Sequence, residues 1–234
     1  MPIKMYKPIG ITPLELIENY KKENNIKCKM SFAGRLDPMA HGEMILLEGE
    51  ECKSQNLYCG KDKVYEFKIL YGVKTDTLDI LGLLEESIIS KQNNIGNFIG
   101  KFLQPYPIFS SIYVKKKPLW WWAKNGIINE IEIPKKEIEI YELEKMSETY
   151  INNLDLLNEI IGKLSLLSLD NREKFRFVEI KKEWEILLSL CENKNKIFNI
   201  ETYICKVSSG TYIRSLCERM GGIAYDIKRV KIIL

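Results

Sequence analysis

The sequence predicts an α+β fold, and two observations indicate this class. Helical and strand patterns both occur along the chain, but they do not alternate strictly, as they would in a doubly wound sheet. The chain has 234 residues, of which 45% are hydrophobic, so it can bury a full core as one large domain or two small ones.

The first predicted element is a helix that begins at Pro13. Thr12 occupies the N-cap, Pro13 the first helical position and Glu15 the third, which together form a capping box. Ile17 and Tyr20 follow at helical spacing. The start of this helix is therefore defined by local sequence.

Residues 63–72 have the pattern of a β-strand. Apolar side chains recur with a period of two from Tyr65 to Tyr71, so they share one face, and Gly72 ends the run. By this pattern alone, Tyr65 is a core or cross-strand aromatic residue. Residues 75–79 follow with the turn and capping chemistry of a solvated loop.

The C-terminal half combines three helices with one strand. Residues 153–169 and 179–193 have apolar residues at helical spacing, whereas residues 200–207 have the pattern of a strand. A short turn leads from this strand into a helix predicted for residues 211–220, which a glycine pair ends.

One carboxylate, in the stretch GRLDP at residues 34–38, has two possible roles. Asp37 precedes Pro38, and an aspartate before a proline is typical of a turn. The alternative is that the turn exists to present a catalytic carboxylate. Considered alone, these residues leave both interpretations open.

Arg214 occupies an unusual position for a cation. If the helix begins near Thr211, Arg214 lies in its first turn, where the helix dipole disfavours positive charge. An anion nearby would explain it, either a carboxylate such as Asp37 or a phosphate of a ligand. A side chain turned into solvent is the alternative, because surface penalties of this kind are only roughly 0.3 to 1 kcal/mol.

Residues 114–126 place three consecutive lysines beside three consecutive tryptophans. Three adjacent side chains cannot all face one core on a helix or a strand, so at least one tryptophan meets a partner or lies at the surface. Lysines beside exposed aromatic rings suit a phosphate backbone with stackable bases. A partly buried aromatic cluster with solvated lysines is the alternative.

Composition excludes several classes of protein. The net charge is only +3, with 35 Lys and Arg against 32 Asp and Glu, so a nucleic-acid surface requires clustered cations. The six cysteines contain no C-x-x-C pair, and the single histidine, His41, completes no Cys/His zinc set. No stretch approaches 18 apolar residues, and the first ten residues lack the apolar region of a signal peptide. We expect a cytoplasmic protein with reduced thiols and no structural metal.

Five segments, in order along the chain, resemble the successive motifs of the TruB family, tRNA pseudouridine synthases that act on a T-loop uridine. The segments are KPIGIT (7–12), AGRLDPMAHGEMILLEGE (33–50), KVYEFKILYGVKTDTLDILG (63–82), PIFSSIYVKKKPLWWWAKNG (107–126) and SSGTYIRSLCERMG (208–221). The resemblance implies the pseudouridine synthase fold, with a mixed, mostly antiparallel central sheet flanked by helices and loops.

The resemblance also implies roles for individual residues. Asp37 corresponds to the catalytic aspartate, Tyr65 to the tyrosine that stacks on the target base, and Arg214 to the arginine that pairs with the carboxylate. The residues expected to bind RNA or substrate are Lys7, Phe32, Arg35, Asp79, Tyr212, Lys115, Lys116, Lys117 and Arg229. Phe32 stands where the family has a histidine that helps open the T-loop, and His41 stands where a small hydroxyl residue is common.

The resemblance implies an isomerase that needs no metal, redox cofactor or nucleotide. It also implies that the protein is a monomer and that its partner is RNA, namely the tRNA T-arm. We expect one catalytic domain over residues 1–234, a helical insertion at about 145–199, and no PUA domain. Alternatives are a stem-loop in rRNA, mRNA or viral RNA as substrate, and a non-catalytic RNA-binding chaperone. A third is a base-releasing glycosidase that uses Asp37 with a carboxylate from residues 48–51.

Overall fold

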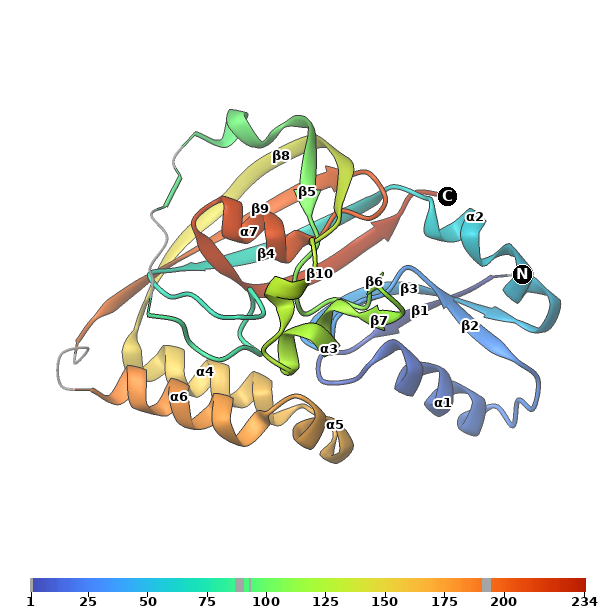
Figure 1. Ribbon diagram of the computed structural model, residues 1–234, viewed down its shortest axis with the longest axis horizontal. Coiled ribbons are helices and arrows are strands. Elements are labelled where there is room, and N and C mark those ends of the chain that lie inside the picture. The colour runs from blue at the N-terminus through green and yellow to red at the C-terminus, as the bar shows by residue number, and fades with distance from the viewer. Residues whose placement is uncertain (1, 87–90, 93, 191–194) are drawn as a thin grey trace.

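The computed structural model describes residues 2–86, 91–92, 94–190 and 195–234, and its main feature is an eight-stranded sheet (Figure 1). The strands of this sheet are β1 (Ile3–Lys7), β2 (Met30–Ala33), β3 (Ala40–Glu48), β4 (Lys63–Tyr71), β5 (Gly100–Pro105), β8 (Lys135–Asn152), β9 (Ile197–Val207) and β10 (Gly222–Ile232). Two short strands, β6 (Tyr113–Val114) and β7 (Lys117–Pro118), form a separate hairpin.

Helices and short 3-10 segments connect the strands. The α-helices are α1 (Pro13–Glu23), α2 (Gln55–Cys59), α3 (Leu119–Lys124), α4 (Asn153–Ser165), α5 (Leu169–Lys174), α6 (Phe177–Ser189) and α7 (Ile213–Arg219). The 3-10 segments are η1 (Gly49–Ser54), η2 (Ile95–Phe98) and η3 (Ile128–Glu130).

The sheet is mixed but mostly antiparallel. Its strand order is β1-β3-β10-β4-β9-β8-β5, and β2 pairs with β3 off this path. Among the described strands, the pair of β3 and β10 is parallel and the other pairs are antiparallel. The predicted α+β class is therefore confirmed.

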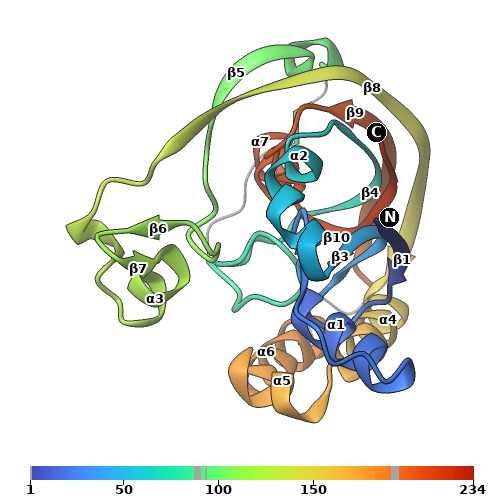
Figure 2. The ribbon, with the colours of Figure 1, turned by 90° about the vertical axis from the view of Figure 1, so that its right-hand side faces the viewer.

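The central strand β4 follows the predicted alternation. Tyr65, Phe67, Ile69 and Tyr71 are buried in one apolar cluster, and the strand ends at Tyr71, before Gly72. The cluster continues onto α7, which the curved strands surround in Figure 2. Local alternation thus located the core face of this strand correctly.

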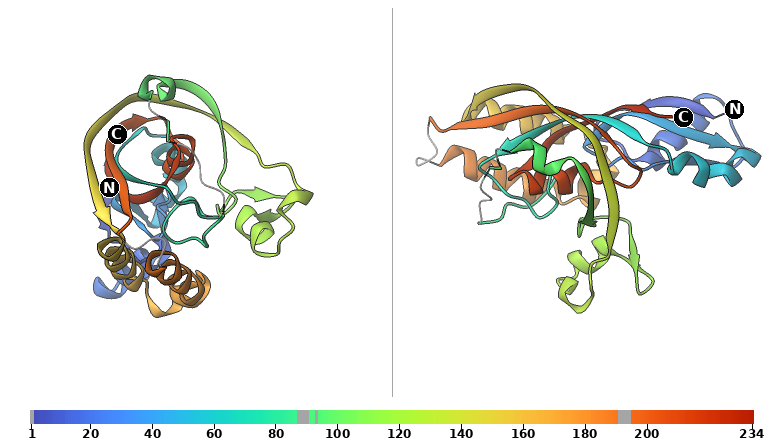
Figure 3. Two further views of the ribbon diagram at one scale, coloured as in Figure 1. Left: turned by 90° about the vertical axis from the view of Figure 1, so that its left-hand side faces the viewer. Right: turned by 90° about the horizontal axis from the view of Figure 1, so that it is seen from above.

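The other face of the sheet is covered by α4 and α6. Leu156 and Ile160 of α4 and Trp184 of α6 are fully buried against Leu70 of β4 and Ile200 of β9. Figure 3 shows these helices side by side, connecting the ends of β8 and β9. The two faces therefore have separate apolar clusters.

The predicted helices of the segment 145–199 differ from the observed ones at their ends. Residues 153–169 break after Ser165, and α5 begins at Leu169. The helix predicted for 179–193 begins two residues earlier, at Phe177, and residues 191–193 lie outside the described part of the chain. Both ends of the segment 145–199 belong to β8 and β9, so the helices occupy the connection between two paired strands.

Five cysteines fall in the described residues, and all are free thiols: Cys28, Cys52, Cys59, Cys205 and Cys217. Cys191 lies outside the described residues. Within the described ranges, no helix has the length and apolar character required to cross a membrane.

Candidate active site

Asp37 lies in the turn that joins β2 to β3. The Ala40 amide donates to the Asp37 carbonyl at 3.0 Å, and Pro38 occupies the second position of this four-residue turn. Gly34 has φ of 76°, a left-handed conformation that glycine adopts without steric cost. The turn prediction is confirmed.

Two buried cations support the backbone on either side of Asp37. Lys7 Nζ donates to the carbonyls of Pro8, Ile11 and Pro38 at 2.8, 2.7 and 3.3 Å. Arg229 donates from Nη2 to the Gly34 carbonyl at 3.0 Å. These bonds connect β1 and β10 to the turn.

The predicted role of Lys7 and Arg229 in binding RNA stays a prediction, and the structure shows that both side chains point into the protein. The two residues are 0% and 1% exposed, and backbone carbonyls accept hydrogen bonds from both side chains. Burial also lowers the pKa of Lys7 to about 7. The resemblance had assigned them to the surroundings of the active site and the RNA surface, and full burial was not expected because long cationic side chains are rarely fully buried.

The Asp37 carboxylate pairs with Arg214, which lies in the first turn of α7. Arg214 Nε donates to Asp37 Oδ2 at 2.7 Å, and its Nη1 and Nη2 donate to the carbonyls of Thr77 and Phe109 at 2.6 and 3.2 Å. The Arg214 side chain is 3% exposed, whereas that of Asp37 is 28% exposed. Arg214 was expected to have an anion nearby, and that anion is the Asp37 carboxylate.

Asp79 supplies a second carboxylate to Arg214, with Oδ2 at 3.8 Å from Nε. Its Oδ1 accepts hydrogen bonds from Thr77 Oγ1 at 2.7 Å and from the Leu81 amide at 2.9 Å. Burial raises the pKa of Asp79 to about 6, although the charge of Arg214 opposes this shift. The loop at 75–79, whose turn chemistry alone suits a solvated loop, is largely buried, and its Thr77 carbonyl accepts a hydrogen bond from Arg214.

The carboxylate of Asp37 opens into a cavity of about 360 Å³. This volume falls within the range of small-molecule sites. Its wall includes Tyr212 before α7, Trp120 and Lys124 of α3, Lys174 at the end of α5, and Phe175 and Arg176 in the turn before α6. The cavity therefore combines segments that are far apart in the sequence.

The two tyrosines predicted for the site have different positions. Tyr212 lines the cavity and packs edge-on against Tyr106, with ring centres 5.5 Å apart. Burial raises the pKa of Tyr212 to about 12. Tyr65 is 7% exposed within the apolar cluster and is not among the residues that line the cavity. Its stacking on a target base stays a prediction.

Phe32 and Arg35 lie close together on the segment before Asp37. The Arg35 guanidinium is 5.6 Å from the centre of the Phe32 ring, a cation–π contact, and Arg35 also lines the cavity. Phe32 itself packs on the core and does not line the cavity. Of this pair, only Arg35 is in a position to meet a ligand inside the cavity.

The predicted lysine cluster lies on the β6–β7 hairpin, beside the cavity rather than in it. Lys115, Lys116 and Lys117 are exposed and do not line the cavity. As predicted, the adjacent tryptophans face different ways, since Trp122 is 9% exposed and Trp120 is 42% exposed. The hairpin and α3 project away from the sheet in Figure 2.

Several residues of the site were missed in the sequence. Lys124 was identifiable in principle, because it lies four residues after Trp120 and so shares its helix face. Lys174 and Arg176 had no comparable signal, since only the packing of the helices brings them to Asp37. His41, which had no apparent partner, contacts the Tyr6 hydroxyl and Asp226 Oδ2.

The glutamates considered for a glycosidase lie elsewhere. Residues 48–51 end β3 and begin η1, and none of them lines the cavity. The carboxylate that lies near Asp37 is Asp79, which shares Arg214 with it. Among the described residues, no three His, Cys, Asp or Glu side chains form a candidate metal site.

Comparison with solved structures identifies the fold as that of pseudouridine synthases. The chain aligns over 99% of its length with 48% of a chain in the crystal structure of a Cbf5–Nop10–Gar1 complex, with TM-score 0.54 and 15% identity. A chain from an H/ACA RNP bound to a substrate RNA containing 2′-deoxyuridine aligns with TM-score 0.53 and 14% identity, over 99% of this chain and 47% of that one. At these identities the likeness concerns the fold alone.

Comparison of the sequence with protein families identifies one family within the pseudouridine synthases. Residues 21–156 match the family described as TruB family pseudouridylate synthase, N-terminal domain, and the chain belongs to this family. The matched range contains Asp37, Tyr65 and Asp79, whereas Tyr212 and Arg214 follow it.

Curated relatives named tRNA pseudouridine synthase B support this membership. The protein of Caldicellulosiruptor saccharolyticus is 36% identical over 150 residues, which cover 62% of this chain and 51% of that protein. The protein of Fusobacterium nucleatum is 33% identical over 225 residues, which cover 94% of this chain and 61% of that protein. The chain thus spans about half to three-fifths of the length of these relatives.

Proposed function

We propose that this chain isomerises a uridine to pseudouridine in structured RNA, with the tRNA T-loop as substrate and Asp37 as catalytic carboxylate. The observation that carries the proposal is the ion pair of Asp37 and Arg214 beside a cavity of about 360 Å³. Membership in the TruB family and relatives named tRNA pseudouridine synthase B support the substrate class. We also propose that the protein acts as a cytoplasmic monomer.

The reaction breaks the N-glycosidic bond, rotates the uracil and rejoins it to the ribose through C5. One carboxylate serves this chemistry either as a nucleophile at C1′ or as a base at C2′. Arg214 binds Oδ2 of Asp37, so Oδ1 is left for the substrate. The guanidinium orients the carboxylate and stabilises its negative charge.

The target nucleotide has to leave its stack to reach Asp37, as bases do in other enzymes that react with them. Tyr212 and Trp120 place aromatic rings in the cavity wall, where they offer a surface for an extruded base. Arg35 adds a cation at the same wall. In this proposal the target base also makes a stacking contact with Tyr65.

The test uses an unmodified tRNA transcript and maps pseudouridine after incubation with the parent protein and with Asp37→Asn. We expect pseudouridine in the T-loop with the parent, none with Asp37→Asn, and RNA binding by both. Equal product from both proteins would show that Asp37 is not the catalytic residue. Pseudouridine found only in another RNA would mean that this other RNA is the substrate. Free uracil among the products would indicate a glycosidase.

A further inference from the structure

The cavity beside Asp37 has a wall that comes from the helices between β8 and β9. This wall consists of residues 174–176, at the end of α5 and in the turn before α6. Trp120 and Lys124 of α3 form another part of the wall. The two parts are connected, because Lys124 Nζ donates to the Lys174 carbonyl at 2.8 Å.

The turn before α6 is held in place by Arg176. Its Nη1 and Nη2 donate to the Asp76 carboxylate at 2.7 and 3.1 Å, and its guanidinium lies 4.7 Å from the ring centre of Phe109. Arg176 has φ of 56°, a left-handed conformation in which glycine would avoid steric cost. The bidentate pair with Asp76 gives a physical reason for an arginine at this position.

Helix α6 itself is attached to the loop that supports Arg214. Glu183 Oε2 accepts from the Leu84 amide at 2.7 Å, and Trp184 Nε1 donates to the Ile80 carbonyl at 3.1 Å. The same loop carries Thr77 and Asp79, which contact Arg214. The wall and the Asp37–Arg214 pair therefore share one rigid support, as a precise binding site requires.

The cavity lining carries an excess of positive charge. Two carboxylates line it, Asp37 and Asp79, and both lie beside Arg214. The cationic residues that line it are Arg35, Lys124, Lys174, Arg176 and Arg214. Such a surface suits a polyanion, because each phosphate bound by Lys or Arg releases condensed counterions.

Lys174 is the cation of this wall that is best placed to meet a phosphate. The Arg176 guanidinium is occupied by Asp76, and Lys124 Nζ by a carbonyl. Lys174 is exposed, and its ammonium has no hydrogen bond or ion pair within the part of the chain that the structure describes. A second hollow of about 330 Å³ shares Phe109, Lys124 and Arg176 with the cavity, so the two hollows adjoin at these residues.

We propose that the turn between α5 and α6 belongs to the RNA-binding surface, and that Lys174 binds a backbone phosphate next to the nucleotide that enters the cavity. The inference rests on the proposed function, because it takes RNA as the substrate. The helices between β8 and β9 then contribute directly to substrate recognition, in addition to covering the sheet.

The test measures RNA dissociation constants at several salt concentrations, with kcat and KM, for the parent chain and three variants. Lys174→Ala should raise Kd and KM roughly three- to tenfold and reduce the salt slope by about 1, with kcat at saturating RNA unchanged. Lys182→Ala is the matched control, since Lys182 is an exposed lysine of α6 that does not line the cavity. Lys174→Arg should retain the parent values.

A second measurement identifies the phosphate. In a series of RNAs, each phosphate around the target uridine is replaced in turn by a neutral methylphosphonate. One replacement should weaken binding to the parent but not to Lys174→Ala. If Lys174→Ala matches Lys182→Ala in Kd and salt slope, and no replacement depends on Lys174, the inference is overturned.

The two proposals fail separately in these experiments. If the parent makes no pseudouridine in any RNA, the proposed function is wrong, whereas a binding loss confined to Lys174→Ala would still support the phosphate contact. If the parent is active and Lys174→Ala behaves as the parent does, only the inference about Lys174 is wrong. Thermal unfolding of all three variants checks that the fold is intact.

Discussion

Arg214 Nε donates to Asp37 Oδ2 at 2.7 Å, although 177 positions separate the two residues in the sequence. Arg214 is buried in the first turn of α7, and Asp37 lies half-buried in the turn between β2 and β3. The pair therefore connects the C-terminal helix to the N-terminal part of the sheet. All three nitrogen positions of the guanidinium have acceptors, so its orientation is fixed.

Arg214→Lys should reduce kcat roughly 100-fold or more on an RNA substrate, because an ammonium cannot bind Asp37, Thr77 and Phe109 in the same geometry. The charge is kept, so a loss in this variant reports on orientation. Single-turnover kinetics with saturating RNA checks this expectation. Activity at the parent level would mean that a positive charge near Asp37 is sufficient.

The variant Lys7→Met tests how the buried Lys7 affects the pH dependence of the free energy of unfolding. Lys7 supports the turn at Asp37 through the Pro38 carbonyl. Burial holds the pKa of Lys7 at about 7 in the folded protein, below its ordinary value of 10.5, so the unfolded chain binds more protons between these values. Parent stability should therefore rise relative to the variant from pH 7 to pH 9, by at most about 1.4 kcal/mol per pH unit. Urea unfolding at pH 7, 8 and 9 measures the difference, and a constant difference would contradict it.

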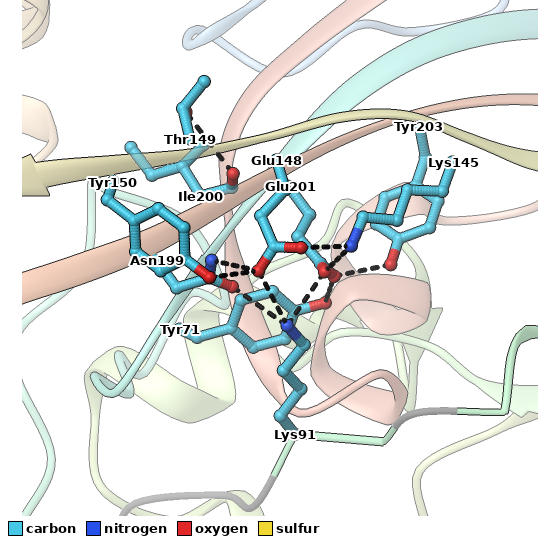
Figure 4. Close-up of polar contacts among 10 residues, drawn as sticks. All are labelled: Tyr71, Lys91, Lys145, Glu148, Thr149, Tyr150, Asn199, Ile200, Glu201 and Tyr203. Carbon is cyan, nitrogen blue, oxygen red and sulfur yellow. Dashed lines mark hydrogen bonds and ion pairs between the residues drawn. The ribbon is translucent and has the colours of Figure 1, made fainter.

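A buried acid far from the cavity provides a contrast (Figure 4). Glu201 of β9 is 1% exposed, and its Oε2 accepts hydrogen bonds from the hydroxyls of Tyr71 and Tyr203 at 2.8 and 2.6 Å. Lys91 Nζ lies 2.8 Å from Oε1, and Lys145 Nζ also pairs with it. Burial alone would raise the pKa of Glu201, but hydrogen bonds from Lys145 and Lys91 lower it to about 2.

Glu201→Gln should destabilise the fold at pH 7 by roughly 1.5 to 3 kcal/mol, because the hydroxyls and ammonium groups that donate to Glu201 lose a charged acceptor, while both lysines keep Glu148 as a partner. The folded pKa lies below the ordinary 4.5, so this stabilisation is present above pH 4.5 and is lost as pH falls toward 2. The two proteins should therefore converge in acid unfolding curves. Pseudouridine formation at pH 7 should be unchanged, since Glu201 does not line the cavity.

The β6–β7 hairpin allows the lysine cluster to be tested without damaging the fold. Lys115 and Lys116 form its two-residue turn with φ of 46° and 64°, a geometry that favours Asn-Gly. The double variant Lys115→Asn, Lys116→Gly should keep the hairpin while weakening RNA binding and lowering its salt slope by up to about 2. An unchanged slope in a binding titration would mean that these lysines face away from RNA.

Some parts of the fold could be predicted because the determining signal is local. The capping box at Thr12 is present, with Glu15 bonded to the Thr12 amide at 2.7 Å, and α1 begins at Pro13. The alternation from Tyr65 to Tyr71 gave the correct core face of β4. In each case a few neighbouring residues determine the backbone conformation.

Local patterns and ordered motifs were thus enough to predict the α+β class, the main helices and strands, the turn at Asp37 and membership in the family. Only the tertiary structure decided that Lys7 and Arg229 support that turn from inside, and that Lys174 reaches the cavity wall. The physical reason is that burial of a long cationic side chain depends on carbonyls and carboxylates from distant segments. No local period or spacing encodes those partners, because the sheet and its helices bring them together only on folding.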